Sequence, residues 1–183
     1  LNENKNILKI LKKKNIKPKL IYFSSTLVNT YLENTSKKIK SISLNNKYCK
    51  SKYDAEKFIK KNYENYIICR VSNIYDNKFK KSGIFKNIIN SMQSETLLRV
   101  SNTNTFRNYI HANDVANHIQ KLIKSSIKKK NKKFITLANE NFKIIEIIKL
   151  FEKATKRKIN FQNLKKDLKK DYSQKIFSNS LKF

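Results

Sequence analysis

The sequence predicts an α/β fold in which helices alternate with the strands of a parallel sheet. Two short apolar runs, Leu20–Phe23 and Tyr66–Val71, are rich in aliphatic and aromatic residues, which is typical of strands buried on both faces of such a sheet. Each run follows a segment in which apolar residues recur at helical spacing. This helix–strand–helix–strand order is that of parallel strands joined by helices.

The first half of the chain supplies these elements in order. Apolar residues recur on one face from about Asn4 to Asn15, and Pro18 marks the turn after this helix. The first strand leads into the hydroxyl-bearing residues 24–26 and a polar loop that extends to about Lys47. A second helical pattern runs from Tyr48 to Tyr63, directly before the second strand.

The second half is more mixed. Helices are predicted over 84–92, 114–125 and 144–156, and short strands over 97–100, 109–111 and 134–137. Asp114 is a residue of the type that caps the start of a helix. Because Gly83 is the only glycine, the turns must use Asn, Asp and Lys.

The chain is strongly basic, with a formal net charge of +29 over 183 residues. Such a charge usually suggests nucleic acid or an anionic surface as a partner. However, Lys, Asn and Ile are abundant throughout, as an AT-rich coding sequence would produce in any protein. The charge is also spread along the chain, apart from Lys-rich runs at 12–14, 128–133 and 165–170. We expect no nucleic-acid partner, and a basic nucleic-acid-binding protein is the alternative.

Other features bound the class of protein. Cys49 and Cys69 form neither a CxxC pair nor a zinc pattern, which predicts reduced thiols in a cytoplasmic protein. His111 and His118 lack an HExxH context, so we expect no metal site. No apolar stretch is long enough to span a membrane, and we expect no signal peptide. The chain begins with Leu1 inside a helical pattern, from which we expect a fragment.

The first chemical signal is Tyr48 followed by Lys52, which lie four residues apart and therefore project from one helix face. An ammonium beside a phenol favours the phenolate, so such a Tyr can exchange a proton with a substrate hydroxyl or carbonyl. The Lys can also bond the ribose of a nicotinamide cofactor. By itself the pattern is weak, because Tyr53 and Lys57 repeat it and a solvated helix pair is the plain alternative.

The surroundings separate the two pairs. Tyr48 opens its helix, Ser51 stands directly before Lys52, and residues 21–26 (IYFSST) lie upstream. That string resembles the catalytic strand end of extended short-chain dehydrogenase/reductases of the NAD-dependent epimerase/dehydratase family, the UDP-galactose 4-epimerase-like enzymes. The resemblance implies that Thr26 bonds the reacting oxygen, with Ser25 as the nearby alternative.

Four further blocks follow in the order of that family. Residues 51–57 (SKYDAEK) resemble its SK-x-x-AE-K block, and residues 70–75 (RVSNIY) resemble R-P-S-N-V-Y-G. Residues 107–116 (RNYIHANDVA) resemble R-D-Y-I-H-V-x-D-V-A, and residues 141–146 (NFKIIE) resemble N-Y-S-I-K-E. The resemblance implies that Asn73 contacts the substrate and that Arg107 grips the diphosphate of a nucleotide sugar, for which a guanidinium fork is well shaped. It also implies that His111 and Asp114 are structural.

The resemblance predicts the C-terminal part of a doubly wound, Rossmann-like parallel sheet plus a smaller mixed α/β substrate domain. Residues 1–76 would be the remainder of the dinucleotide-binding domain. Residues 77–183 would be mostly the substrate-binding domain, with 107–125 returning to the Rossmann part. The family also implies a homodimer. The cofactor, NAD or NADP, would be contacted by Ser24, Ser25, Tyr48, Lys52 and Val71.

The implied activity moves hydride between a sugar carbon and the nicotinamide, with Thr26, Tyr48 and Lys52 as the catalytic set. The family's outcomes are an epimerase, a 4,6-dehydratase or a 4-ketoreductase. Leu27 and Val28 follow Thr26 where a dehydratase usually has acidic residues, which disfavours dehydratase. Epimerase and 4-ketoreductase both stay open, and a non-catalytic member of the family is a further alternative.

The sequence also departs from the family pattern. The turn G-x-x-G-x-x-G, which cradles the pyrophosphate in the family, is absent from a chain whose one glycine is Gly83. Cys49 stands where a Gly usually follows the catalytic Tyr, and Asp76 ends the block that the family ends with Gly. The missing turn fits a chain that lacks its N-terminal part, so we expect the chain alone to be inactive.

Overall fold

A computed structural model describes residues 2–29, 32, 47–76, 83–124 and 134–164. The chain divides into two compact units, the first formed by residues 1–72, 115–137 and 177–183 and the second by residues 73–114 and 138–176. Most of the predicted polar loop and the Lys-rich runs at 128–133 and 165–170 lie outside the described residues. Within the described part, no helix is both long and apolar enough to cross a membrane.

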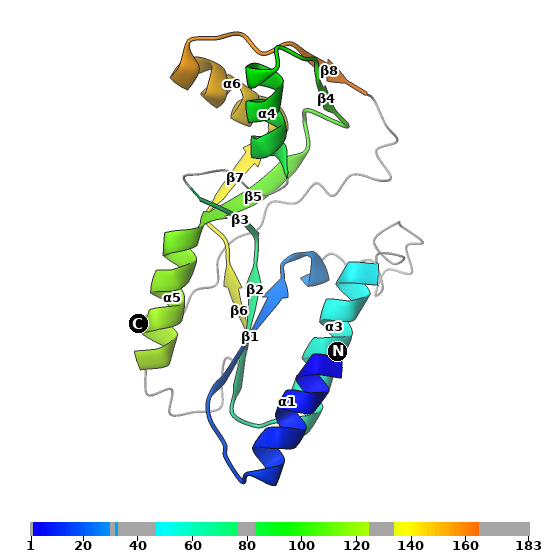
Figure 1. The fold of residues 1–183 in the computed structure, drawn as a ribbon, viewed down its shortest axis with the longest axis vertical. Helices are drawn as coiled ribbons and strands as arrows, with labels where there is room; N and C mark the ends of the chain where they lie inside the picture. The colour runs from blue at the N-terminus through cyan, green and yellow to red at the C-terminus, as the bar shows by residue number, and fades with distance from the viewer. Residues whose placement is uncertain (1, 30–31, 33–46, 77–82, 125–133, 165–183) are drawn as a thin grey trace. The chain divides into compact units, whose positions relative to one another are not determined.

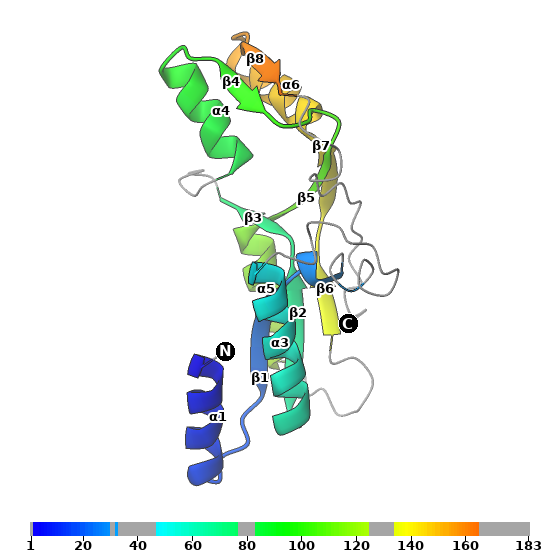
Figure 2. The ribbon, with the colours of Figure 1, turned by 90° about the vertical axis from the view of Figure 1, so that its right-hand side faces the viewer.

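The first unit is a parallel sheet with helices on both faces (Figure 1). Its elements are α1 (Asn2–Lys13), β1 (Leu20–Ser25), α3 (Lys47–Asn62), β2 (Tyr66–Val71), most of α5 (Ala112–Lys124) and β6 (Phe134–Leu137). The strands follow the order β1-β2-β6, and β2 is parallel to both neighbours. α1 and α3 cover one face and α5 the other (Figures 1 and 2). This arrangement confirms the predicted α/β class.

The first sheet forms where the sequence is most continuously apolar. In β2, the side chains of Tyr66 and Ile68 face α3, where they pack with Ile59. The alternate residue Cys69 is also buried, as expected for a strand covered on both faces. The register places Leu20 opposite Tyr66 and Ser25 opposite Val71, so β1 and β2 end together.

The second unit combines a mixed sheet with a two-stranded one and two helices (Figure 1). Its elements are β3 (Asn73–Tyr75), α4 (Ile84–Gln93), β4 (Leu98–Val100), β5 (Phe106–His111), β7 (Glu140–Lys143), α6 (Ile144–Thr155) and β8 (Phe161–Asn163). β5 is parallel to β3 and antiparallel to β7, and β4 is parallel to β8. The core of the unit joins α4, β4 and α6 through the buried side chains Ile88, Leu98, Val100, Ile147 and Ile148.

The structure differs in detail from the expected organisation. The first strand continues past Phe23 to Ser25, because Ser24 and Ser25 keep the parallel register with β2. Phe134–Leu137, expected in the substrate domain, pairs with β2 and belongs to the first unit. Residues 107–111 lie in β5 of the second unit, so the chain returns to the first unit only at Val115. Strands β3, β7 and β8 were not predicted, since three or four residues show little periodicity.

Candidate functional site

The carboxyl ends of β1 and β2 bring the predicted hydroxyl residues to one edge of the first sheet. The Thr26 N–H donates to the Val71 carbonyl oxygen at 3.2 Å. The Ser25 Oγ accepts a hydrogen bond from the Leu27 N–H at 3.3 Å. Ser24, Ser25 and Thr26 are all buried. In open parallel sheets this edge is where ligands bind, so the local geometry suits the predicted role.

Lys52, on the first turns of α3, lies between the end of β1 and Tyr48. Its Nζ donates to the Phe23 carbonyl oxygen at 3.1 Å. The same Nζ is 5.4 Å from the ring centre of Tyr22 and 5.8 Å from that of Tyr48, within the range of cation–π contacts. The Tyr48 side chain is 51% exposed, so a ligand can reach its phenol. The structure therefore brings Tyr48, Lys52 and the strand end together within one unit.

The second Tyr–Lys pair has a different environment. The Lys57 Nζ lies 4.9 Å from the Tyr53 ring centre and 3.5 Å from a carboxylate oxygen of Asp54. Lys57 is exposed, and these partners are on its own helix. Contacts of this kind are typical of a solvated helix face.

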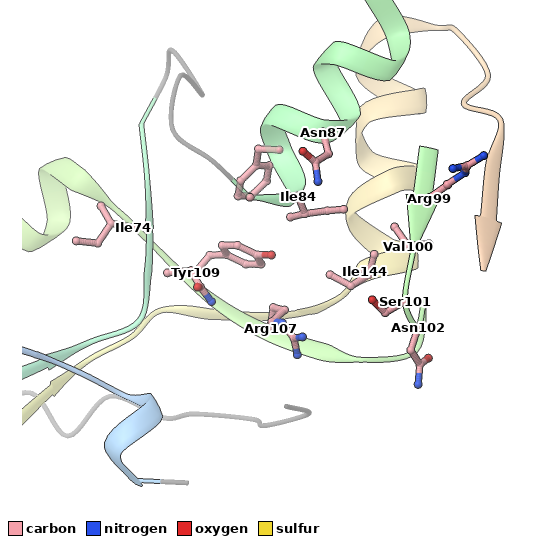
Figure 3. Close-up of a pocket in the computed structure, with 13 residues that line it drawn as sticks. Ile74, Ile84, Asn87, Arg99, Val100, Ser101, Asn102, Arg107, Tyr109 and Ile144 are labelled. Atoms are coloured by element: carbon pink, nitrogen blue, oxygen red, sulfur yellow. The ribbon is translucent and has the colours of Figure 1, made fainter. Parts of the chain in front are cut away.

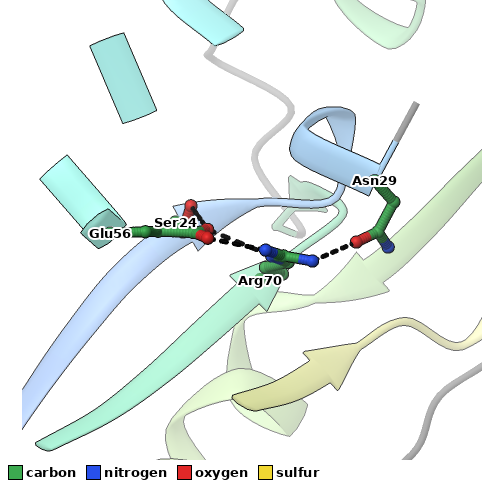
Figure 4. Close-up of polar contacts among 4 residues, drawn as sticks. All are labelled: Ser24, Asn29, Glu56 and Arg70. Atoms are coloured by element: carbon green, nitrogen blue, oxygen red, sulfur yellow. Dashed lines mark hydrogen bonds and ion pairs between the residues drawn. The ribbon is translucent and has the colours of Figure 1, made fainter. Parts of the chain in front are cut away.

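A set of buried and half-buried polar side chains, the Arg70 network (Ser24, Asn29, Glu56 and Arg70), connects β1, α3 and β2 (Figure 4). Arg70 donates to the two carboxylate oxygens of Glu56 at 3.0 and 2.6 Å, and its Nη1 donates to Asn29 Oδ1 at 2.6 Å. Ser24 Oγ donates to Glu56 Oε1 at 2.5 Å. The sequence analysis quoted Glu56 and Arg70 within motifs but gave them no role. Their signal was the position of Glu56, one helical turn after Lys52.

The second unit contains a cavity of about 390 Å³ that both predicted substrate residues, Asn73 and Arg107, line. The Arg107 side chain lies along the floor of this cavity in Figure 3, near Tyr109. The volume is in the range of small-molecule sites. Further polar lining residues come from short segments without a motif, which is why the sequence did not reveal them: Asn87, Arg99, Ser101 and Asn102.

Tyr109 and Arg107 lie beside each other in the lining of this cavity. Burial raises the pKa of Tyr109 to about 12, while the nearby Arg107 acts in the opposite direction. The phenol therefore stays neutral, and the positive charge beside it belongs to Arg107.

Asn73 Nδ2 donates to the Asn108 carbonyl oxygen at 2.8 Å, which connects β3 to β5 and fixes the orientation of the Asn73 amide. An amide oxygen so fixed is suited to accept a hydrogen bond from a ligand hydroxyl.

A smaller cavity of about 250 Å³ in the second unit is lined mainly by aromatic residues, among them Tyr75 and Phe151. Burial, and then the carboxylates of Glu140 and Asp114, raise the pKa of Tyr75. Neither predicted substrate residue is among its described lining. The larger cavity is therefore the candidate substrate site.

The two cysteines are buried and free. Burial raises the pKa of the Cys49 thiol, and its backbone hydrogen bond acts in the opposite direction. Burial also raises the pKa of Cys69 to about 11. Thiols of this kind are poor nucleophiles near neutral pH. In the described ranges, no cluster of three or more His, Cys, Asp or Glu side chains could hold a metal ion.

The family model of the RmlD substrate binding domain matches residues 9–156 of the chain. No curated protein sequence matches the chain.

Solved structures of nucleotide-sugar enzymes are similar in fold. UDP-glucuronic acid 4-epimerase from Bacillus cereus, in complex with UDP-glucuronic acid and NAD, aligns with a TM-score of 0.70 at 18% identity, over 93% of this chain and 57% of that one. UDP-N-acetylglucosamine 4-epimerase from Methanobrevibacter ruminantium M1, in complex with UDP-N-acetylmuramic acid, gives 0.66 at 17% identity, over 95% and 59%. RMD from Pseudomonas aeruginosa, complexed with NADPH, gives 0.65 at 16% identity, over 89% and 59%. The chain thus spans less than two thirds of the length of each.

Proposed function

The chain belongs to the RmlD substrate-binding-domain family, and from this premise we propose that it is part of an NAD(P)-dependent nucleotide-sugar epimerase or 4-ketoreductase. The observation that carries the proposal is Lys52, whose ammonium contacts both the end of β1 and the Tyr48 ring. Enzymes of similar fold that were solved with UDP-sugars, NAD or NADPH support it. A homodimer, which the family resemblance implies, and a cytoplasmic location, expected from the two unpaired cysteines, belong to the same proposal.

The residues at the edge of the first sheet fit a nicotinamide nucleotide. Ser72, directly after Val71, has a buried Oγ without a hydrogen-bond partner among the described residues. Buried hydroxyls nearly always have a hydrogen-bond partner, so we propose that this Oγ bonds the cofactor. Lys52 has three N–H donors, of which the contact with Phe23 uses one. These donors, with Tyr48 and Ser25, suit the ribose hydroxyls and the carboxamide of such a cofactor.

In the proposed reaction the bound nicotinamide supplies the hydride acceptor or donor. The Tyr48 phenolate takes the proton of the sugar C4 hydroxyl as the C4–H bond breaks and the carbonyl forms, and the phenol returns a proton in the reverse direction. Lys52 stabilises the phenolate by its charge. Thr26 donates a hydrogen bond to the reacting oxygen, where negative charge develops.

On the substrate side, we propose that the larger cavity binds the nucleotide diphosphate. Arg107 supplies a guanidinium fork, which pairs with two phosphate oxygens at once. Asn73 would accept or donate a hydrogen bond to the sugar. The glycine-rich phosphate cradle of the family is not among these residues, since the one glycine, Gly83, lines the substrate cavity. We therefore propose that the chain alone is inactive and that the dinucleotide phosphates bind a segment outside it.

The function is tested on the complete protein that contains this chain, incubated with NAD or NADPH and a set of UDP- and dTDP-sugars. The proposal predicts either inversion at the sugar C4 or reduction of a 4-keto sugar with consumption of NADPH. A protein that binds both ligands and performs neither conversion would contradict the proposal.

A further inference from the structure

We infer that the Arg70 network positions the proposed catalytic residues by linking α3, which carries Tyr48 and Lys52, to the turn that carries Thr26. This inference rests on the proposed function. Arg70 is the central residue, since its guanidinium donates on one side to Glu56 of α3 and on the other to Asn29 of the turn after β1 (Figure 4). The guanidinium also lies over the ring of Phe134 in β6, 5.1 Å from its centre.

The first arm of the Arg70 network sets the rotation of α3. Tyr48, Lys52 and Glu56 are spaced by four residues and therefore form one stripe along the helix. Glu56 bonds Ser24 of β1, and Lys52 bonds the carbonyl of Phe23, so the stripe faces the end of β1 at two successive positions. A rotation of α3 that moved the Tyr48 phenol would break the Glu56 contacts.

The second arm holds the turn that contains Thr26. The Asn29 N–H donates to the Thr26 carbonyl oxygen at 2.9 Å, while the Asn29 side chain accepts the bond from Arg70. The Thr26 N–H is bound in turn to Val71 of β2, the neighbour of Arg70 in sequence. Thr26 is thus connected to β2 in two ways. Its N–H bonds Val71 directly, and its carbonyl oxygen is linked to Arg70 through Asn29.

The Arg70 network is expected to contribute more to the position of its side chains than to the net stability of the fold. Glu56 is only 3% exposed, and a buried ion pair recovers little more than its desolvation cost. Its bidentate geometry, however, allows one arrangement of the two side chains. Because a lone buried charge is costly, removal of Glu56 or Arg70 would threaten folding itself. Asn29 is neutral and half-buried, so its substitution tests the second arm without that penalty.

The test compares Asn29→Ala, Asn29→Asp and Asn65→Ala in the complete enzyme. Asn65 is the control, since its side-chain amide also forms a hydrogen bond to a sequence-distant group, donating to the Lys17 carbonyl oxygen, but at the amino ends of the strands. Asn29→Ala should lower kcat about tenfold, below the ~10²-fold that a misplacement of about 1 Å can cost. KM for the nucleotide sugar, cofactor affinity and Tm should stay close to those of the parent. Asn29→Asp, which keeps the acceptor for Arg70, should restore most of the turnover.

Two results would overturn the inference. One is an unchanged kcat in Asn29→Ala, and the other is an equal loss of kcat in Asn65→Ala, as general destabilisation would produce. Tyr48→Phe, measured alongside, separates this failure from failure of the proposed function. If Tyr48→Phe abolishes turnover and Asn29→Ala does not affect it, only the positioning role fails. If Tyr48→Phe is as active as the parent, the proposed function fails.

Discussion

Lys52 has the contacts that a catalytic lysine of this kind needs. The Lys52 ammonium donates a hydrogen bond to the main chain of β1, which fixes its position at the end of the strand. The same ammonium lies against the Tyr48 ring. Lys57, one and a half turns further along, contacts an acidic partner and a Tyr on its own helix. The same residue types at the same spacing therefore have different surroundings, and the contact with the strand end is what distinguishes them.

Arg107 provides a prediction for substrate binding. Arg107→Ala in the complete enzyme should raise KM for the nucleotide sugar by roughly 10-fold or more, the scale of a lost charge-assisted bond, with cofactor affinity nearly unchanged. Initial rates against sugar concentration, together with cofactor titration, measure both quantities. Arg157→Ala is the matched control, because Arg157 belongs to the same unit and its ion pair with Glu95 is exposed. A loss confined to cofactor affinity would exclude the diphosphate role.

Cys69 provides a prediction for stability against pH. Burial raises the pKa of this thiol from 9.0 to about 11. Well below pH 9 the thiol is protonated in both the folded and the unfolded chain. Above pH 9 only the unfolded chain loses the proton, so the free energy of unfolding should fall as the pH rises toward 11, by at most about 2–3 kcal/mol.

Denaturant unfolding at about pH 8 and about pH 10.5 measures this loss in the parent and in Cys69→Ala. The variant lacks the thiol and should lose less stability between the two pH values. Burial also raises the pKa of Tyr109, to about 12, but this phenol is present in both proteins, so its contribution cancels in the comparison. An identical loss in the two proteins would show that the Cys69 pKa is not raised.

At the scale of elements, the long and apolar segments were predictable. β2 and β6 have the predicted bounds, and α4 and α6 end within one residue of them, because strong periodicity and burial act together there. The strand β3 could not be predicted, since its three residues form a strand only through pairing with β5. The site shows the same division. The motifs could be found in the sequence, and the roles of their residues stay predictions, whereas the contacts of the Arg70 network depend on which sequence-distant side chains the register brings together.

The start of α4 gives a prediction about an element boundary. Gly83 precedes the helix with φ of 125° and ψ of −174°, a conformation essentially limited to glycine. A Cβ at this position would meet no atom within 4 Å, so the cost of a substitution comes from the backbone and not from a clash. Gly83→Ala should therefore destabilise the protein by about 1–3 kcal/mol.

Thermal or denaturant unfolding of Gly83→Ala measures this cost. Asn90→Ala is the control, since Asn90 is exposed on the same helix and Ala is the better helix former. The control should be as stable as the parent or slightly more stable. Equal stability of Gly83→Ala and the parent would show that the backbone at Gly83 relaxes without strain.

At the scale of the whole molecule, each unit carries its own part of the proposed chemistry. The first contains the proton-transfer residues at the carboxyl ends of β1 and β2, and the second contains the cavity with Asn73 and Arg107. The Lys and Arg residues that give the net charge of +29 are distributed along the chain. The nucleic-acid alternative would account for this charge but not for the contact of Lys52 with Tyr48 and the end of β1, nor for the ion pair of Arg70 with the buried Glu56.

The central claim, that Tyr48 exchanges the proton of a reacting sugar hydroxyl, is tested most directly by two isosteric substitutions in the complete enzyme. Tyr48→Phe removes one phenol from α3, and Tyr53→Phe removes another from the same helix. Under saturating cofactor and nucleotide sugar, Tyr48→Phe should reduce kcat by roughly 10²-fold or more, as expected for a positioned acid/base, while Tyr53→Phe retains the parent rate. The reverse ranking, or equal rates in all three proteins, would contradict the account.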